Sequence, residues 1–173
     1  MNELSREGRE EGRRKTLNQN STNFNEEEIG KIILDSAFKV HTALGPGLLE
    51  SVYEAAMAVE LRNRGLRVEK QVPIAVTYEG EQLEAGFRAD LIIEQKVLVE
   101  LKSVETVTPL FKKITTNYLR LIPLKLGYLI NFNESHLKNG ITRVVNGLEG
   151  KNFFSPSQPS RASRDILNSV AVI

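Results

Sequence analysis

Two apolar segments joined by a tight turn constrain the fold of this 173-residue chain more than any other feature. The first segment is GFRADLIIE, the second is KVLVELKSVE, and the turn between them falls at Glu94-Gln95. Strands this apolar are typical of the buried centre of a sheet, so the pair predicts a central β-hairpin. Because side chains alternate along a strand, one face of the hairpin is expected to be wholly apolar. The residues expected on that face are Leu91, Ile93, Val97, Val99 and Leu101.

The opposite face of the hairpin is predicted to carry charge. Glu100 and Lys102 share a face of the second strand, because they are two positions apart. With a turn at residues 94–96, Asp90 on the first strand lies across from Glu100 or one position off it. Two carboxylates and an ammonium group therefore converge on one patch of a buried sheet. Burying the acids is costly unless something compensates their charge.

Two kinds of compensation fit this patch. The first is an internal ion pair, in which Lys102 neutralises Glu100 and also Asp90. The second is a divalent cation such as Mg²⁺ or Mn²⁺ bound by both carboxylates, since these hard cations prefer oxygen ligands. A metal-bound water is a nucleophile near neutral pH, and Lys102 would then face a substrate phosphate. The D-x9-E-x-K spacing is short, so the residues alone leave both interpretations open.

Two helices are predicted ahead of the hairpin. EEEIGKIILDSAFKVHTALG has apolar residues at helical spacing and stops at Gly45-Pro46-Gly47. GLLESVYEAAMAVELRNRG follows and ends at Gly65. The apolar stripe expected on this second helix is Leu49, Val52, Ala56 and Val59. Glu50, in its first turn, either interacts with the helix dipole alone or is a third carboxylate that reaches the metal site.

The remaining segments complete an α/β pattern. RVEKQVPIAVTYEGEQL alternates and contains a hairpin turn at Glu79-Gly80. After the central hairpin we expect a helix over residues 107–121, a buried strand in LKLGYLINFN, and a last short helix over residues 139–148. The resulting order, α-α-β-β-β-α-β-α, predicts a mixed central sheet flanked by helices, because the hairpins are antiparallel and the last strand arrives through a helix.

Composition limits the function classes. The chain is 40% hydrophobic and 26% charged, which is typical of a globular domain, and it has no cysteine for disulfides or thiolate zinc sites. We expect a flexible polar tail over residues 1–24, one domain over 25–149 and a Ser/Pro-rich tail over 150–173. No apolar stretch is long enough to span a membrane, so a cytoplasmic location without a membrane partner is expected. The net charge of +1 argues neither for nor against nucleic acid.

Three separated motifs resemble one known family. HTALGPGLLESVYEAAMAVEL, GFRADLIIEQKVLVELKSVE and LGYLINFN, in this order, are similar to the small bacterial GxxExxY proteins, and the name-giving residues are Gly47, Glu50 and Tyr53. The resemblance covers about 125 residues and leaves both tails outside. This family is placed in the PD-(D/E)XK nuclease-like superfamily, whose members cut DNA or RNA with Mg²⁺. The resemblance therefore implies a restriction endonuclease-like core.

The resemblance also implies roles for the charged residues. Asp90 and Glu100 would bind Mg²⁺ (or Mn²⁺), Lys102 would lie near the scissile phosphate, and Glu50 would be the helix acid that completes such metal sites. His41 matches the family's histidine ahead of the Leu-Gly-Pro-Gly turn, and no chemistry is assigned to it. The catalytic residues expected on this basis are Glu50, Asp90, Glu100 and Lys102, and the metal ligands are Asp90, Glu100 and Glu50.

One segment departs from the family pattern. Family members usually carry a glutamine four residues before a tyrosine in the helix after the E-x-K strand. Here the tyrosine is Tyr118, but Ile114 replaces the glutamine, and Phe111 stands where a histidine is common. An apolar side chain cannot bond a metal-bound water or a phosphate oxygen, and the loss of such partners reduces metal affinity or activity.

Two functions follow from these observations. The chain is predicted to be a metal-dependent nuclease acting on DNA or RNA, or else a catalytically inactive nuclease-like scaffold that binds nucleic acid or a protein partner. Whether it is an active enzyme stays open at this point. Four basic residues in and after the helix of residues 107–121 either contact phosphates or form an ordinary solvated surface. These residues are Lys112, Lys113, Arg120 and Lys125.

Overall fold

The computed structural model describes residues 24–83 and 86–147 of the chain. The two tails predicted at the ends lie outside these residues, apart from Phe24. The elements are α2 (Glu26–Leu44), α3 (Glu50–Asn63), β1 (Val68–Pro73), β2 (Val76–Tyr78), β3 (Glu81–Leu83), β4 (Arg88–Ile93), β5 (Val97–Lys102), α4 (Pro109–Leu121), β6 (Leu126–Asn131), η1 (Leu137–Gly140) and β7 (Ile141–Val145).

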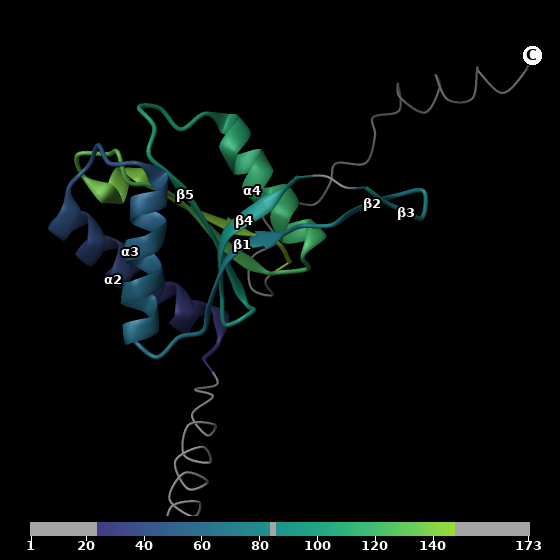
Figure 1. The fold of residues 1–173 in the computed structure, drawn as a ribbon, viewed down its shortest axis with the longest axis horizontal. Helices are drawn as coiled ribbons and strands as arrows, with labels where there is room; N and C mark the ends of the chain where they lie inside the picture. The colour runs from purple at the N-terminus through teal and green to yellow at the C-terminus, as the bar shows by residue number, and fades with distance from the viewer. Residues whose placement is uncertain (1–23, 84–85, 148–173) are drawn as a thin grey trace, which may run out of the picture.

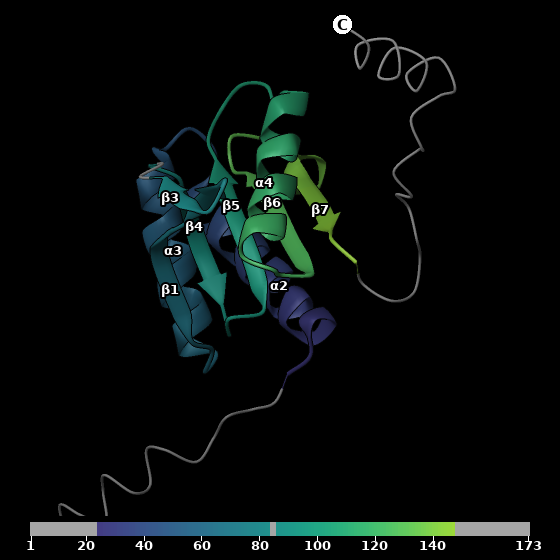
Figure 2. The ribbon, with the colours of Figure 1, turned by 90° about the vertical axis from the view of Figure 1, so that its right-hand side faces the viewer.

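A five-stranded mixed sheet forms the middle layer, in the order β1-β4-β5-β6-β7. Only the β5–β6 pair is parallel among these neighbours, and the others are antiparallel. Figure 1 shows α2 and α3 on one face of this sheet and α4 on the other, and Figure 2 shows the strands in order beneath α4. The predicted α/β class, with a mixed sheet flanked by helices, is confirmed.

Local sequence signals account for the ends of these elements. Asn25 and Glu28 form a reciprocal capping box at the start of α2, which satisfies two backbone donors that the helix leaves free. Pro109 occupies the first turn of α4, where its missing N–H is not needed. Glu94 and Gln95 both adopt positive φ at the centre of a tight turn in which the Lys96 N–H donates to the Ile93 carbonyl, and residues 94–96 connect β4 to β5.

The core lies on both faces of the sheet. The larger apolar cluster fills the space between the sheet and the α2–α3 layer, and it contains the five residues predicted for the apolar face of the central hairpin. A smaller cluster, which includes Ile92, Leu98 and Leu119, lies under α4. The apolar face predicted for the hairpin is confirmed. The opposite face, for which charge was predicted, also carries apolar residues, because Ile92 and Leu98 alternate with Asp90 and Glu100 along the same strands.

The apolar stripe predicted for α3 is wrong at three of its four residues, and only Ala56 packs against the core. Leu49, Val52 and Val59 are 75%, 40% and 58% exposed, whereas Tyr53 and Met57 are fully buried. Apolar residues occur on both sides of this helix, so the 3.6-residue period fitted two faces equally well. Packing selected the face that carries the larger side chains.

The helix predicted over residues 139–148 is also wrong. A short 3-10 turn, η1, leads into β7, which pairs antiparallel with β6 and closes that side of the sheet. β7 contains Ile141, Thr142, Val144 and Val145, whose branched side chains favour strands. The segment RVEKQVPIAVTYEGEQL likewise divides into β1, in the main sheet, and a separate β2–β3 hairpin that turns at the predicted Glu79-Gly80.

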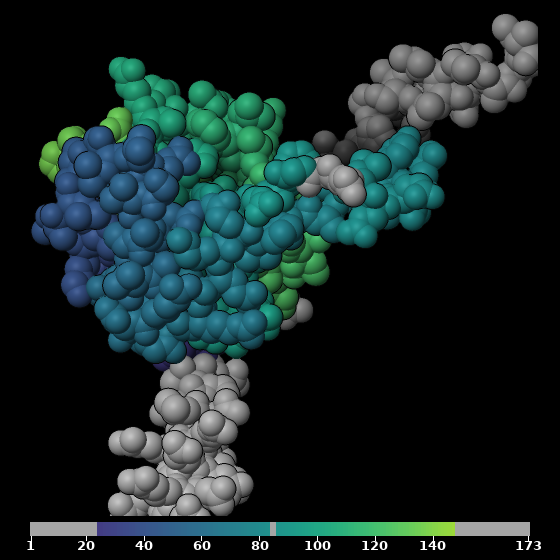
Figure 3. Space-filling model, viewed as in Figure 1, coloured from purple at the N-terminus to yellow at the C-terminus, as the bar shows by residue number. Residues whose placement is uncertain are grey.

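The β2–β3 hairpin projects from the body of the molecule, as the space-filling view in Figure 3 shows. No helix in the described part of the chain is long and apolar enough to cross a membrane.

Candidate active site

The central hairpin places the two predicted strand acids opposite each other. Leu91 of β4 pairs with Val99 of β5, so the next position along the ladder sets Asp90 against Glu100. Of the two registers that the sequence allowed, the structure has the one in which these acids face each other directly. Both side chains lie at the end of the sheet where β4 begins and β5 ends.

Glu100 is the most deeply buried of the charged site residues, with 5% of its surface exposed. One of its carboxylate oxygens, Oε1, is buried and has no hydrogen-bond partner among the described residues. Burial raises the pKa of Glu100 to about 8, and the neighbouring charge of Asp90 adds to this shift. Glu100 is therefore a carboxylate whose charge is only partly compensated by the protein.

Asp90 has a fixed orientation. Its Oδ2 accepts a hydrogen bond from the backbone N–H of Leu101 at 2.8 Å, across the strand pair. Burial raises the pKa of Asp90, while the bond from Leu101 and the charge of Lys102 act in the opposite direction. Burial thus disfavours the charged form of both acids, and for each of them a backbone hydrogen bond and the charge of Lys102 lower the pKa in part.

Lys102 lies between the strand acids and the helix acid. Its Nζ is 3.3 Å from Oε2 of Glu50 and 3.9 Å from Oδ2 of Asp90, and it donates to the carbonyl oxygen of Leu101 at 2.6 Å. The ammonium group also lies 5.7 Å from the centre of the Phe111 ring. Within the described residues its ion pairs are with Glu50 and Asp90, so the Asp90 part of the internal ion pair considered from the sequence is present. No ion pair with Glu100 forms among these residues, although the charge of Lys102 lowers the pKa of Glu100.

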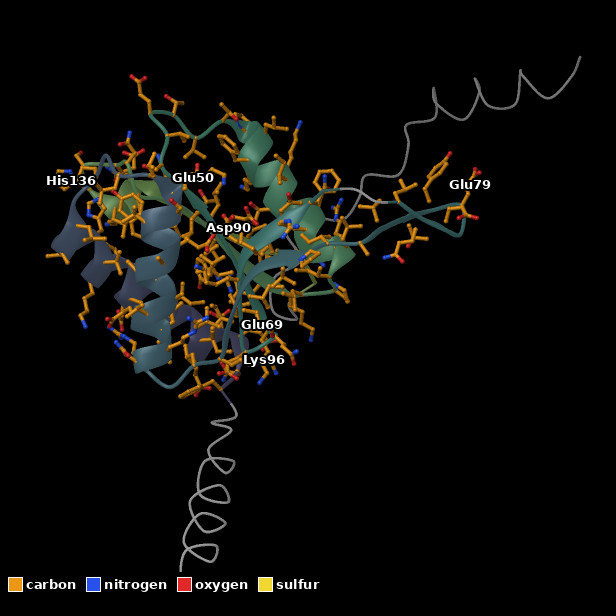
Figure 4. The ribbon with its side chains drawn as sticks, in the orientation of Figure 1. Glu50, Glu69, Glu79, Asp90, Lys96 and His136 are labelled. Carbon is orange, nitrogen blue, oxygen red and sulfur yellow. The ribbon has the colours of Figure 1, made fainter. Side chains whose placement is uncertain are left out.

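A hydrogen-bonded turn brings Glu50 to the site. Gly47 has φ of +92°, which a glycine adopts without strain, and the chain then enters α3 at Glu50. The hydroxyl of Tyr53 donates to the carbonyl of Gly45 at 2.7 Å and accepts from the N–H of Leu48 at 3.1 Å. Figure 4 shows Glu50 at the beginning of α3 close to Asp90 on β4.

The motif Gly47, Glu50 and Tyr53 is therefore one structural unit. The Tyr53 ring is buried and stacks on Phe132 with the ring centres 4.5 Å apart, which anchors the turn to the end of β6. His41 is anchored nearby, because its Nε2 lies 2.7 Å from the carbonyl oxygen of Glu134. That contact gives His41 a structural partner at the turn after β6 and does not involve the acids.

The side of α4 that faces the site is aromatic and apolar. Phe111, Ile114 and Tyr118 follow one another at helical spacing and are all half-buried. The charges of Glu100 and Asp90 contribute, after burial, to a raised pKa of the Tyr118 hydroxyl, which places this tyrosine near both acids. Ile114 lies one helical turn before Tyr118 on the same side. The departure found in the sequence therefore lies on the same side of α4 as the tyrosine that is near both acids.

Two further polar residues reach the site and were not singled out from the sequence. The amide nitrogen of Gln71, on β1, donates to Glu54 of α3 and lies 3.4 Å from Oδ1 of Asp90. Glu54 follows Glu50 by four residues and so shares its side of the helix, which is the signal that sequence reasoning could have used. Gln71 lies on a different strand, and its proximity follows only from the pairing of β1 with β4.

A model of the PD-(D/E)XK nuclease superfamily matches residues 27–144. This span is more than half of the chain and contains every site residue described above, so the protein belongs to the PD-(D/E)XK nuclease superfamily. A search of curated proteins and a search of solved structures gave no match.

Nucleases of this superfamily generally use divalent metals, and the chemistry of the site residues bears on whether such an ion fits. Within the described residues, no group of three or more histidine, aspartate or glutamate side chains is arranged to hold a metal. Mg²⁺ needs fewer protein ligands, because it keeps several waters and is held by one or two carboxylates with substrate phosphate. The facing Asp90 and Glu100, with an unpartnered buried oxygen on Glu100, fit a cation of that kind.

Proposed function

We propose that this protein is a metal-dependent nuclease of the GxxExxY group, which hydrolyses phosphodiester bonds of DNA or RNA. The observation that carries the proposal is the buried carboxylate of Glu100, unpartnered at Oε1, facing Asp90 with Lys102 beside it. A protein gains no stability from such an arrangement, because buried acids of like charge disfavour each other. Membership of a nuclease superfamily gives the arrangement its most direct explanation.

Asp90 and Glu100 would hold Mg²⁺ or Mn²⁺ through their carboxylate oxygens. The cation, when bound, supplies a water of lowered pKa and offsets charge on the substrate phosphate. The Leu101 N–H keeps Asp90 pointing toward the site through its bond to Oδ2. Glu100 must lose its proton before it can act as a ligand, and a positive charge beside it favours that loss.

Lys102 is the group that meets the phosphate. Its Nζ is held at the site by Glu50 and by the carbonyl of Leu101. A phosphate oxygen placed here receives a charge-assisted hydrogen bond, and the charge that develops during hydrolysis strengthens that bond. Glu50 thereby acts as the acid that positions Lys102, and as a further metal ligand only if Lys102 shifts onto the phosphate.

The substrate would lie along α4. Lys112 and Lys113 are exposed and follow Phe111, the residue that contacts Lys102. Arg120 and Lys125 are exposed at the other end of this helix and just after it. Such cations contact phosphates without reading bases, so they suit a nucleic acid of any sequence.

The first test is a calorimetric titration of the protein with Mn²⁺. The wild type is compared with Asp90→Asn and Glu100→Gln, which remove charge and keep side-chain shape. Glu81→Gln, on the exposed β3 strand, is the matched control for loss of an acid. We expect saturable binding to the wild type and the control, and binding weakened beyond detection in both site variants. Binding that survives in Asp90→Asn and Glu100→Gln would refute the site.

The second test is cleavage. Double- and single-stranded DNA and RNA are incubated with the protein and Mn²⁺ or Mg²⁺, with Asp90→Asn as the matched blank for contaminating nucleases. We expect fragments that the wild type produces and Asp90→Asn does not. If the protein binds the metal and the nucleic acid but produces no fragments, it is instead a catalytically inactive nuclease-like scaffold.

A further inference from the structure

Gln71 has an unusual backbone for a residue in the middle of a strand. Its φ is +49°, in the left-handed region, which residues with a side chain rarely occupy because the Cβ then crowds the backbone. In the register of β1 with β4, Lys70 pairs with Leu91 and Val72 pairs with Ala89. The position between these pairs sets Gln71 against Asp90. The irregularity in β1 therefore occurs opposite a candidate metal ligand.

The side chain of Gln71 joins two acids from different elements. Its Nε2 donates to Oε2 of Glu54 on α3, and it lies 3.4 Å from Oδ1 of Asp90 on β4. The other oxygen of Glu54 forms an ion pair of 2.8 Å with Lys70, the residue before Gln71. Two consecutive residues of β1 thus each supply a donor to this one carboxylate.

Asp90 is consequently held at both of its oxygens. Oδ2 accepts from the Leu101 N–H at 2.8 Å, and Oδ1 faces the amide nitrogen of Gln71. A carboxylate held by a single bond can rotate about its last side-chain torsion, whereas one held at both oxygens has a defined plane. Strained backbone retained beside a site is a recognised means of orienting a functional group.

We propose that Gln71 is a positioning residue, whose left-handed backbone directs its amide onto Asp90 and Glu54 and so fixes the plane of the Asp90 carboxylate for the metal. Its link to the metal rests on the proposed function. Gln71 touches neither the metal nor the phosphate in this scheme, and it acts through Asp90. The amide donor also separates two carboxylates that would otherwise repel each other.

The chain offers a matched control for this proposal. Gln95 is the same residue type, has φ of +55°, and is exposed in the β4–β5 turn, away from Asp90. Gln71→Gly and Gln95→Gly each relieve the same backbone strain, and only the first removes an amide from Asp90. Gln71→Met is the complementary variant, because it keeps the length of the side chain and the strain but removes the donor.

The first measurement is the Mn²⁺ affinity of these variants. We expect Gln71→Gly and Gln71→Met to bind Mn²⁺ about tenfold more weakly than the wild type, as for other groups that orient a metal ligand. Gln95→Gly is expected to bind like the wild type. Equal affinity of all four proteins would overturn the proposal, while absence of binding to the wild type would instead count against the proposed function.

The second measurement needs no metal. Hydrogen exchange of the Leu101 amide reports on Asp90 directly, because Oδ2 of Asp90 is its acceptor. In the metal-free protein we expect exchange at Leu101 to be about tenfold faster in Gln71→Met and Gln71→Gly than in the wild type. Gln95→Gly is expected to leave it unchanged. Unchanged protection in both Gln71 variants would show that Asp90 does not depend on Gln71, whatever the metal does.

Discussion

The Nζ of Lys102 lies 3.3 Å from a carboxylate oxygen of Glu50, and this ion pair joins the end of β5 to the first turn of α3. The same nitrogen is 3.9 Å from Asp90, so one lysine contacts acids from a helix and a strand. Its side chain is 17% exposed and rests near the Phe111 ring. Lys102 is therefore held at the site before any substrate arrives.

Replacing Lys102 with methionine separates catalysis from metal binding. Under the proposed function, Lys102→Met removes the positive charge that would meet the phosphate, and cleavage is expected to fall by about 100-fold or more, as when one charge-stabilising donor is lost. Mn²⁺ affinity is expected to stay the same or to rise, because a competing cation leaves the neighbourhood of Asp90. Cleavage assays and calorimetry measure the two effects separately.

Lys138→Met is the control for this variant, because Lys138 is exposed on η1 and has no role in the proposed site. If Lys102→Met cleaves as fast as Lys138→Met, Lys102 does not act on the phosphate.

Glu100 makes the stability of the metal-free protein depend on pH. Its folded-state pKa of about 8 lies above the ordinary value of 4.5, so the folded protein holds a proton that the unfolded chain has released. The stabilising contribution of the protonated form is complete below about pH 4.5 and is lost as pH rises through about 8. The free energy of unfolding is therefore expected to fall between these values, as measured by urea denaturation in the presence of a chelator.

Glu100→Gln tests the origin of that slope. Glutamine stays neutral at all pH values, so the variant is expected to be more stable than the wild type at pH 8.5, by on the order of 3 kcal/mol. The two proteins are expected to converge toward pH 5. A wild-type slope that persists unchanged in Glu100→Gln would assign the pH dependence to other groups.

The facing acids could be predicted from the sequence because two simple rules determined them. The length of the connection, here residues 94–96, sets the register of a hairpin, and alternation then assigns each side chain to a face. Glu94 and Gln95 provided the turn, and the residue spacing alone was enough to place Asp90 and Glu100 within one position of each other. The face on which each apolar residue between these acids lies could be predicted from the alternation of side chains along a strand alone.

The remaining parts of the site depend on packing between distant segments. Leu49, Val52 and Val59 fit a helical period as well as Tyr53 and Met57 do, and only the volume available against the sheet separates the two sets. Gln71 is far from Asp90 in sequence and meets it through the pairing of β1 with β4 and a backbone conformation that no residue pattern predicts. The β7 strand formed because β6 offered it a free edge.

The turn before α3 is expected to depend on the hydroxyl of Tyr53. Tyr53→Phe removes the bonds to the Gly45 carbonyl and the Leu48 N–H and keeps the ring stacked on Phe132. The free energy of unfolding is expected to fall by about 1–3 kcal/mol, because two backbone groups lose a partner. Tyr78→Phe is the control, since Tyr78 is 64% exposed on the β2–β3 hairpin and should change stability little. Equal stability of the two variants in urea denaturation would contradict this role of Tyr53.

Ile114 offers a way to strengthen the site rather than weaken it. It lies one turn before Tyr118, whose hydroxyl is near Asp90 and Glu100, and its own side chain can neither donate nor accept a hydrogen bond. Ile114→Gln introduces an amide at this position, while glutamine retains good helix propensity. We expect cleavage to increase by about tenfold, the effect typical of a group that orients a metal-bound water or its ligand.

The comparison variant for Ile114→Gln is Ile114→Met, whose side chain has nearly the length of glutamine but carries no amide. It should leave both Mn²⁺ affinity and cleavage at the wild-type level. The two variants differ mainly in the amide itself, so a gain limited to Ile114→Gln would locate the missing polar contact at this position of the helix. Equal behaviour of the two would show instead that Asp90, Glu100 and Lys102 operate without a partner from α4, and that the apolar residue at position 114 limits neither metal binding nor hydrolysis.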